Sequence, residues 1–244
     1  SGGMNWELII AGLAVGSIIG IIMAVKVEMT GMPELVALFN GFGGAASALV
    51  ALSETWKYIE DTTLTLPTGL TLQVVVVAAG LSALVGWMTL TGSILAMFKL
   101  KGGVEIFGKW FSTPTWGPAW LNPVKVLLTV SVLALIVMSI DDPTNTDYLW
   151  AIIGISCLLG IVLVLPIGGA DMPVVVSLLN SLSGIAAAFT GFIISNPVLI
   201  VAGSLVGASG LILTFIMCKA MNRTLPDVLF KSFGGSTKEK VTRT

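Results

Sequence analysis

Two asparagines stand at equivalent places in two copies of one motif, and their side chains are the first candidates for chemistry. Asn40 ends the run Met-Pro-Glu-Leu-Val-Ala-Leu-Phe-Asn, and Asn180 ends the run Met-Pro-Val-Val-Val-Ser-Leu-Leu-Asn, 140 positions later. Each amide follows a proline by seven residues, which is roughly 10 Å along a helix. A polar side chain in lipid is costly unless it has a partner, so two at one depth predict a site between repeats.

The chemistry of these amides is limited because they are uncharged and cannot titrate. An asparagine cannot titrate, but it can hold a chain of water molecules or bond to a titratable group on another chain. The alternative is interhelical hydrogen bonding that only fixes packing, worth about 1 kcal/mol or less. Nearby hydroxyls could line the same path, although serines in membrane helices usually bond their own backbone. These hydroxyls belong to Ser93, Ser177, Ser181, Ser183 and Thr190.

Charged side chains near the same motifs are candidates for a gate. Asp171 directly precedes the second Met-Pro pair, where it could gate a path or cap the free amides of a helix start. Glu34 lies in the first turn of the first motif helix, where a surface carboxylate complements the helix dipole. Lys219 and Arg223 end the last apolar stretch. They are either snorkelling cations or partners for an acidic group, Asp171 among them.

The elements that must position these residues are membrane helices. The chain has 244 residues, of which 55% are hydrophobic and 10% charged, with a mean hydropathy of +1.00. Soluble domains carry about 25% charged residues, and the alternating ten-residue strands of a β-barrel are absent. The sequence therefore predicts an all-α integral membrane protein. Seven stretches are long enough to span: 5–25, 33–53, 71–98, 121–140, 148–165, 172–194 and 197–219.

Basic residues are sorted between the two sides of the predicted bundle. Alternate loops and the C-terminal tail hold eleven of the twelve lysines and arginines, and the opposite loops hold only Lys57 among acidic residues. By the positive-inside rule, the N-terminus lies outside and the C-terminus in the cytoplasm.

The motif pair extends to a predicted parallel repeat of three helices. Residues 5–98 form one copy and 148–219 the other, with the span at 121–140 as the connection. Glycines at helical spacing predict close helix packing in the first and last spans. They are Gly12, Gly16, Gly20, Gly203, Gly207 and Gly210.

The predicted organisation has three parts. Residues 1–4 are expected to be a linker or remnant, 5–223 the transmembrane domain, and 224–244 a polar, flexible linker. Segment 99–120 is expected at the membrane interface, with Trp110, Trp116 and Trp120 as anchors, or alternatively as a docking surface for a cytoplasmic partner.

Metal and nucleotide chemistry have no motif in this sequence. Cys157 and Cys218 lack metal-ligand spacing and there is no histidine, so we expect no metal and interpret the cysteines as packing residues. No P-loop, dinucleotide fingerprint or Ser/His/Asp set is present.

Several runs resemble one known family. They are Lys26–Thr30, Met32–Ala37, Thr91–Ser93, Ile167–Val176 and Ile216–Arg223. Together they resemble the β-subunit membrane domain of proton-translocating NAD(P) transhydrogenase, and the resemblance covers nearly the whole chain.

The resemblance implies a membrane part that conducts protons while separate cytoplasmic domains exchange hydride between NAD(H) and NADP(H). This chain would bind no cofactor itself. Its partners would be an α-type subunit with membrane helices and an NAD(H)-binding domain, and an NADP(H)-binding domain that follows this segment. The whole assembly would be a dimer in the bacterial inner membrane, with no nucleic acid partner.

The resemblance also assigns roles by position. Asp171 would face the NADP(H)-binding domain, Lys219 and Arg223 would couple the last helix to it, and Asn180 would be the channel asparagine. Glu34 and Ser93 match positions along the path. Many members have a relay histidine where this chain has Asn40, so an α-type subunit is expected to supply that group.

Two other functions remain open from the residues. A secondary transporter could bind a small neutral or zwitterionic solute between the paired amides. A structural membrane anchor would use its polar residues for packing alone.

Overall fold

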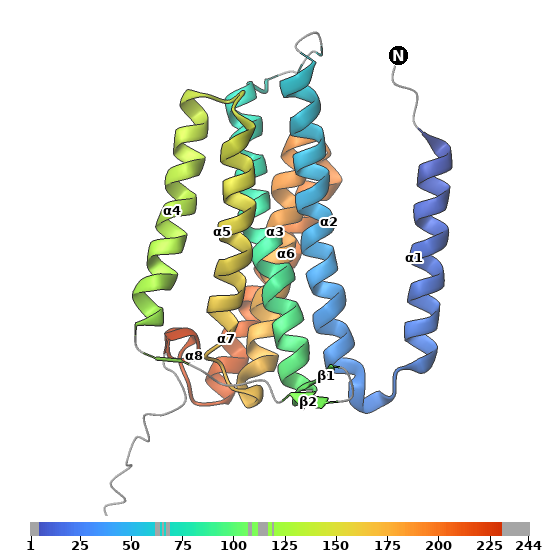
Figure 1. Cartoon of the computed structure of the whole chain (residues 1–244), viewed down its shortest axis with the longest axis vertical. Coiled ribbons are helices and arrows are strands. Elements are labelled where there is room, and N and C mark those ends of the chain that lie inside the picture. Colours follow the sequence, from blue (N-terminus) through green and yellow to red (C-terminus); the bar gives the residue numbers. More distant parts are fainter. Residues whose placement is uncertain are drawn as a thin grey trace, which may run out of the picture.

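Seven long helices run side by side in the computed structural model, which describes residues 5–61, 64, 66, 69–106, 109–111, 117, 118 and 120–230 (Figure 1). Each is long and apolar enough to cross a membrane. The prediction of an all-helical membrane protein with seven spans is therefore confirmed for the described residues. The helices are α1 (Trp6–Lys26), α2 (Met32–Glu60), α3 (Leu72–Leu100), α4 (Leu121–Asp141), α5 (Thr146–Val164), α6 (Met172–Ile193) and α7 (Pro197–Ala220).

The short elements gather at one end of the bundle, the lower end in Figure 1. They are η1 (Met29–Gly31), η2 (Gly169–Asp171), α8 (Leu225–Phe230) and the antiparallel pair β1 (Val104–Ile106) and β2 (Lys109–Phe111). We call this the basic end, because the loops rich in lysine and arginine lie here. The opposite, acidic end holds the α2–α3, α4–α5 and α6–α7 connections.

Helix α3 forms the centre of the bundle. It contacts α2, α4, α5 and α6, while α7 packs on α6. Its buried positions surround the helix rather than forming one stripe, as expected for a helix covered on several sides. A polar residue on α3 is therefore placed between neighbouring helices and away from lipid.

Glycines allow the helices to approach closely, as membrane helices require. A Cβ atom on Gly44 of α2 would lie 3.1 Å from the carbonyl oxygen of Gly86 on α3. On α7, a Cβ on Gly203 would lie 2.6 Å from the backbone nitrogen of Ala188, and one on Gly210 would lie 2.9 Å from Ser181 Cα. The predicted glycine ridge of α7 thus faces α6.

Helix α1 stands apart from the other six (Figure 1), and none of its residues is buried. No atom of the described chain would lie within 4 Å of a Cβ on Gly12, Gly16 or Gly20. The predicted ridge on this helix has no partner within the described residues. Its role in packing stays a prediction.

The predicted internal repeat has one local counterpart in the structure. Helices α2 and α6 each begin after a three-residue 3₁₀ helix and carry proline in the first turn. The first helices of the two predicted repeat copies, α1 and α5, differ. Helix α5 packs on α3, whereas α1 has no buried residue. The repeat as a whole stays a prediction.

Two predicted boundaries differ from the structure. Helix α2 extends to Glu60, seven residues past its predicted end, and the expected flexible linker after Arg223 begins with α8. The added turns of α2 are polar and charged, so hydropathy does not mark them. Residues 1–4 and 231–244, and the side chains of Trp110 and Trp116, lie outside the described part; Trp120 is exposed at the start of α4.

Candidate functional site

Three polar side chains from three helices meet inside the bundle. Asn40 of α2 donates from Nδ2 to Ser93 Oγ of α3 at 3.3 Å. Ser183 of α6 donates to Asn40 Oδ1 at 2.7 Å. We call Asn40, Ser93 and Ser183 the amide cluster. Its members carry no charge, so it can orient water or a substrate but cannot itself give up a proton.

Both predicted asparagines line one groove of about 920 Å³ between α2, α6, α7 and the end of α3. Asn40 is half-buried, while Asn180 is exposed on α6. The groove extends toward the basic end, where Pro33 and Pro173 line it. The structure therefore brings the amides of the two motif copies to one shared space.

The two serines predicted beside Asn180 point toward α7. Ser181 is fully buried and bonds the carbonyl oxygen of Gly207 at 2.5 Å. Ser177 donates to the carbonyl oxygen of Gly210 at 3.3 Å and accepts from Thr214 at 3.1 Å. Ser177 also lines the groove. Ser181 instead lies in the α6–α7 contact, because its position on α6 faces the glycines of α7.

Asp171 and Arg223 form an ion pair at the basic end. Arg223 Nη1 lies 2.8 Å from Asp171 Oδ2, and the Asp171 side chain is 3% exposed against 36% for Arg223. The carboxylate makes no cap hydrogen bond to the described amides of α6. The capping interpretation is therefore wrong here, and the proposed contact with the end of α7 is present.

The turn after α7 directs Arg223 back toward the bundle. Asn222 adopts a left-handed conformation with φ 53°, and the Arg223 N–H donates to the carbonyl oxygen of Cys218 at 2.9 Å. Lys219 remains exposed and lines a shallow cavity of about 410 Å³ with Arg223 and Asp227. Lys219 thus faces the surface of the basic end.

Glu34 belongs neither to the amide cluster nor to the Asp171–Arg223 ion pair. It is half-buried in the first turn of α2, and the lining of the groove includes its neighbour Pro33 but not Glu34. A negative side chain here complements the amino end of α2.

A second group of polar side chains lies toward the acidic end. The sequence points to Thr190 of this group but does not predict that the group forms. Ser82 of α3 is 3.0 Å from Thr190 of α6, and Thr190 donates to the carbonyl oxygen of Ser47 on α2 at 2.9 Å. Between this group and the amide cluster, Thr89 Oγ1 is buried without a hydrogen-bond partner among the described residues. Ser82, Thr89 and Ser93 are spaced so that they lie on one face of α3. This spacing is the sequence signal that would predict a polar face on that helix.

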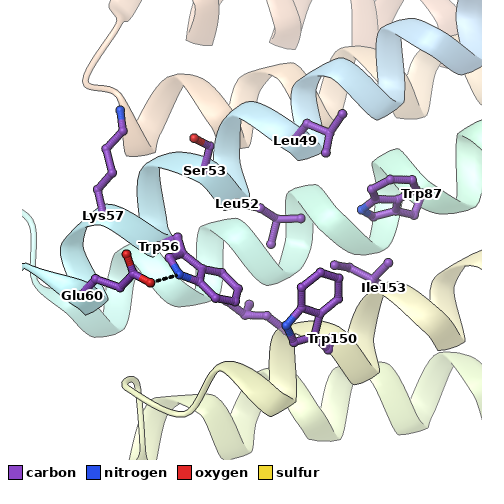
Figure 2. Close-up of a pocket in the computed structure, with 10 residues that line it drawn as sticks. Leu49, Leu52, Ser53, Trp56, Lys57, Glu60, Trp87, Trp150 and Ile153 are labelled. Carbon is purple, nitrogen blue, oxygen red and sulfur yellow. Dashed lines mark hydrogen bonds between the residues drawn. The ribbon is translucent and has the colours of Figure 1, made fainter. Parts of the chain in front are cut away.

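A different groove lies near the acidic end, between α2, α3 and α5 (Figure 2). Trp56 and Trp150 meet edge to face with ring centroids 6.0 Å apart, and Trp56 donates from Nε1 to Glu60 at 2.6 Å. Trp87 of α3 also lines this groove. Tryptophans near helix ends are typical of the membrane interface, and none of the predicted site residues lines this groove.

No group of three potential metal-ligating side chains occurs among the described residues. Cys218 is buried in the apolar cluster at the basic end, together with Ile167, Met172 and Val228. The Cys218 sulfur therefore packs within this apolar cluster.

Comparison with known proteins decides the family. The profile of the NAD(P) transhydrogenase beta subunit family matches residues 2–244. This chain belongs to that family. The NAD(P) transhydrogenase subunit beta of Rhodospirillum rubrum is 40% identical over 229 residues, which cover 93% of this chain and 47% of that protein. The subunit beta of a designated strain of the same species gives the same figures.

Membership in the transhydrogenase beta subunit family confirms the resemblance seen in the sequence. Together with seven apolar helices, it identifies a multi-pass membrane segment of an oxidoreductase subunit. The chain spans about half the length of the relatives it matches.

Proposed function

We propose that this chain is the membrane proton-translocating part of an NAD(P) transhydrogenase. Hydride passes between NAD(H) and NADP(H) on separate domains, and proton movement through this chain is coupled to that exchange. Family membership supports the proposal. The relatives contain as much sequence again as this chain matches, which leaves room for an NADP(H)-binding domain.

The observation that carries the proposal is the shared groove. Asn40 and Asn180 line one space from two helices, and that space extends to Pro173, two residues from the buried carboxylate of Asp171. Water held between the amides carries the proton, and the amide cluster orients that water. Because neither amide titrates, a group on a partner subunit supplies the relay step.

The ion pair at the basic end links the path to the nucleotide domain. When Arg223 is bound to Asp171, the guanidinium occupies the carboxylate. When the two side chains separate, the carboxylate can exchange a proton with water in the groove. The NADP(H)-binding domain must bind these two states with different affinity, because only differential affinity shifts an equilibrium. Exposed Lys219 lies beside Arg223 on the same surface and completes the contact.

The openness of this chain on one side supports a membrane partner. The apolar side chains of Val36 and Phe39 on the groove are exposed, and α1 stands away from α2 (Figure 1). Membrane helices of an α-type subunit cover the groove, and the complete enzyme is a dimer. The basic end faces the bacterial cytoplasm and the acidic end faces outward, as the distribution of lysine and arginine favours.

The test is proton transport by the whole enzyme in vesicles, with Asn180 changed to Leu. Proton movement driven by hydride transfer, followed with a pH-sensitive dye, should fall at least about tenfold, while assembly persists. The matched control is Ser131→Leu, which replaces a half-buried polar residue of α4 that does not line the groove and should pump normally. Normal pumping by the Asn180 variant would refute the assigned path.

A further inference from the structure

A buried lysine near the end of α3 holds the backbone of the α5–α6 connection. Lys99 is 6% exposed. Its Nζ donates to the carbonyl oxygens of Val164 at 3.1 Å and Ile167 at 2.7 Å, and also to that of Leu165. One side chain of α3 therefore uses all three of its N–H donors on a four-residue stretch of another element.

These carbonyls are natural partners for a cation. The last carbonyls of a helix have no partner within the helix, and they carry the negative end of its dipole. Val164 is the last residue of α5 and Leu165 its C-cap. Among the described residues Lys99 forms no ion pair with a carboxylate, so these backbone oxygens offset the cost of burying its charge.

The stretch held by Lys99 leads directly to the carboxylate of the ion pair. Ile167 is followed by Gly168 and by η2, whose last residue is Asp171. A Cβ on Gly169 would lie 3.5 Å from the backbone oxygen of Lys99, so η2 lies close to the end of α3. The position of Asp171 is therefore fixed by contacts with α3 as well as by its chain connection to α5.

The same helix reaches the amide cluster. Ser93, which accepts from Asn40, precedes Lys99 by six residues, or about 9 Å along the helix axis. Helix α3 thus carries, on one rigid segment, a member of the amide cluster and the anchor of the loop that bears Asp171.

We propose that Lys99 is a positioning residue, which sets the carboxylate of Asp171 within reach of Arg223 and makes α3 the link between the amide cluster and the ion pair. This assignment rests on the proposed function for its role in pumping. A displacement of α3 moves the loop with it through three hydrogen bonds, so a change at the amides is transmitted to the basic end.

The first test measures position rather than pumping. In the complete enzyme with Cys157 and Cys218 replaced by Ala, spin labels at the exposed positions Ala170 and Ala220 report the distance between η2 and the end of α7. Lys99→Met should broaden the distance distribution, and Lys99→Arg should keep it narrow. Lys99→Gln, a milder change if the Met variant does not fold, should give intermediate broadening.

The matched control is Lys125→Met, since Lys125 is also buried and donates to a helix-end carbonyl, that of Leu229 on α8. It should leave the 170–220 distance unchanged. A narrow, wild-type distribution in Lys99→Met or Lys99→Gln would overturn the positioning role. Equal broadening by the Lys125 variant would overturn it as well.

The second test separates this role from the proposed function. Lys99→Met should lower coupled proton transport about tenfold, as misplacement of a reacting group does, and Lys99→Arg should restore most of it. Broadened distances with normal transport would leave the anchor in place but refute both its share in pumping and the gate assigned to Asp171. Loss of transport with unchanged distances would overturn the anchor alone.

Discussion

Arg223 lies 2.8 Å from Asp171 although 52 positions separate them in the chain. The contact joins the residue before α6 to the residue that follows the turn after α7. It closes the α6–α7 pair at the basic end, beyond the glycine contacts that Gly203, Gly207 and Gly210 make with α6.

Replacing either member of this pair should affect stability and coupling together. Asp171→Asn removes the negative charge that Arg223 contacts, and Arg223→Gln leaves a buried carboxylate, which is the costlier change. Because Arg223 is partly exposed, we expect losses of about 1–3 kcal/mol in the free energy of unfolding. Thermal unfolding in detergent and dye-based proton transport measure the two effects.

The double variant Asp171→Asn with Arg223→Gln is the control for this pair. It should regain part of the stability, since no uncompensated charge remains, yet still fail to couple. Recovery of full proton transport in the double variant would contradict a gating role.

The amide cluster should matter more for transport than for stability. Asn40→Leu removes the donor to Ser93 and the acceptor for Ser183, yet interhelical hydrogen bonds in lipid contribute only about 0.6 kcal/mol on average. We expect a loss of about 1 kcal/mol in stability and at least about a tenfold fall in proton transport. Asn40→His, which restores a hydrogen-bonding group that can titrate, should transport protons. Wild-type pumping by the Leu variant would contradict a role of Asn40 in the path.

Overpacking the α6–α7 contact should destabilise the bundle. A side chain at Gly203 would meet backbone atoms of Ala188 and Gly184 at 2.6 Å, which cannot move aside as a flexible side chain can. Gly203→Val should lower the free energy of unfolding by about 1–3 kcal/mol or more. In this chain alone, Gly16→Val should have no such effect, because no atom of the described residues would lie within 4 Å of a Cβ at Gly16. Equal melting temperatures for the two variants would refute the close contact.

The buried hydroxyl of Thr89 gives a prediction of opposite sign. Thr89 is 0% exposed, and Oγ1 has no hydrogen-bond partner among the described residues. Valine has nearly the same shape and removes the unpaired group, so Thr89→Val should raise the free energy of unfolding by about 1 kcal/mol. Ser82→Ala, which deletes a hydroxyl 3.0 Å from Thr190, should lower it. A destabilised Thr89 variant would show that this hydroxyl is satisfied in the protein.

The sequence predicts the spans well because hydropathy and length are properties of the chain itself. It predicts the end of α2 poorly, since residues 54–60 are polar and a helix that leaves the apolar layer loses its hydropathy signal. Helix α8 escapes prediction for a related reason. It is six residues long and is held by contacts from elsewhere, Asn122 and Lys125 of α4.

Side-chain direction is the part of the site that sequence reasoning could not supply. Asn180 and Ser181 are neighbours, yet one lines the groove and the other faces α7, because successive residues of a helix point about 100° apart. The paired motifs predict that the two amides lie at one depth. They do not predict which neighbouring side chain each amide contacts. The sequence marks Lys99 only as one of the basic residues near a helix end, because its partners are backbone oxygens and residue types do not reveal them.

The isolation of α1 has a consequence for any experiment on this chain by itself. Between helices already in a bilayer, lipid tails are as apolar as leucine, so no hydrophobic force draws a free span back to its neighbours. Among the described residues, α1 is connected to the other six helices through residues 27–31, so without a partner polypeptide in the intervening space its tilt and azimuth are set by lipid. Measurements that depend on its location therefore require the complete assembly.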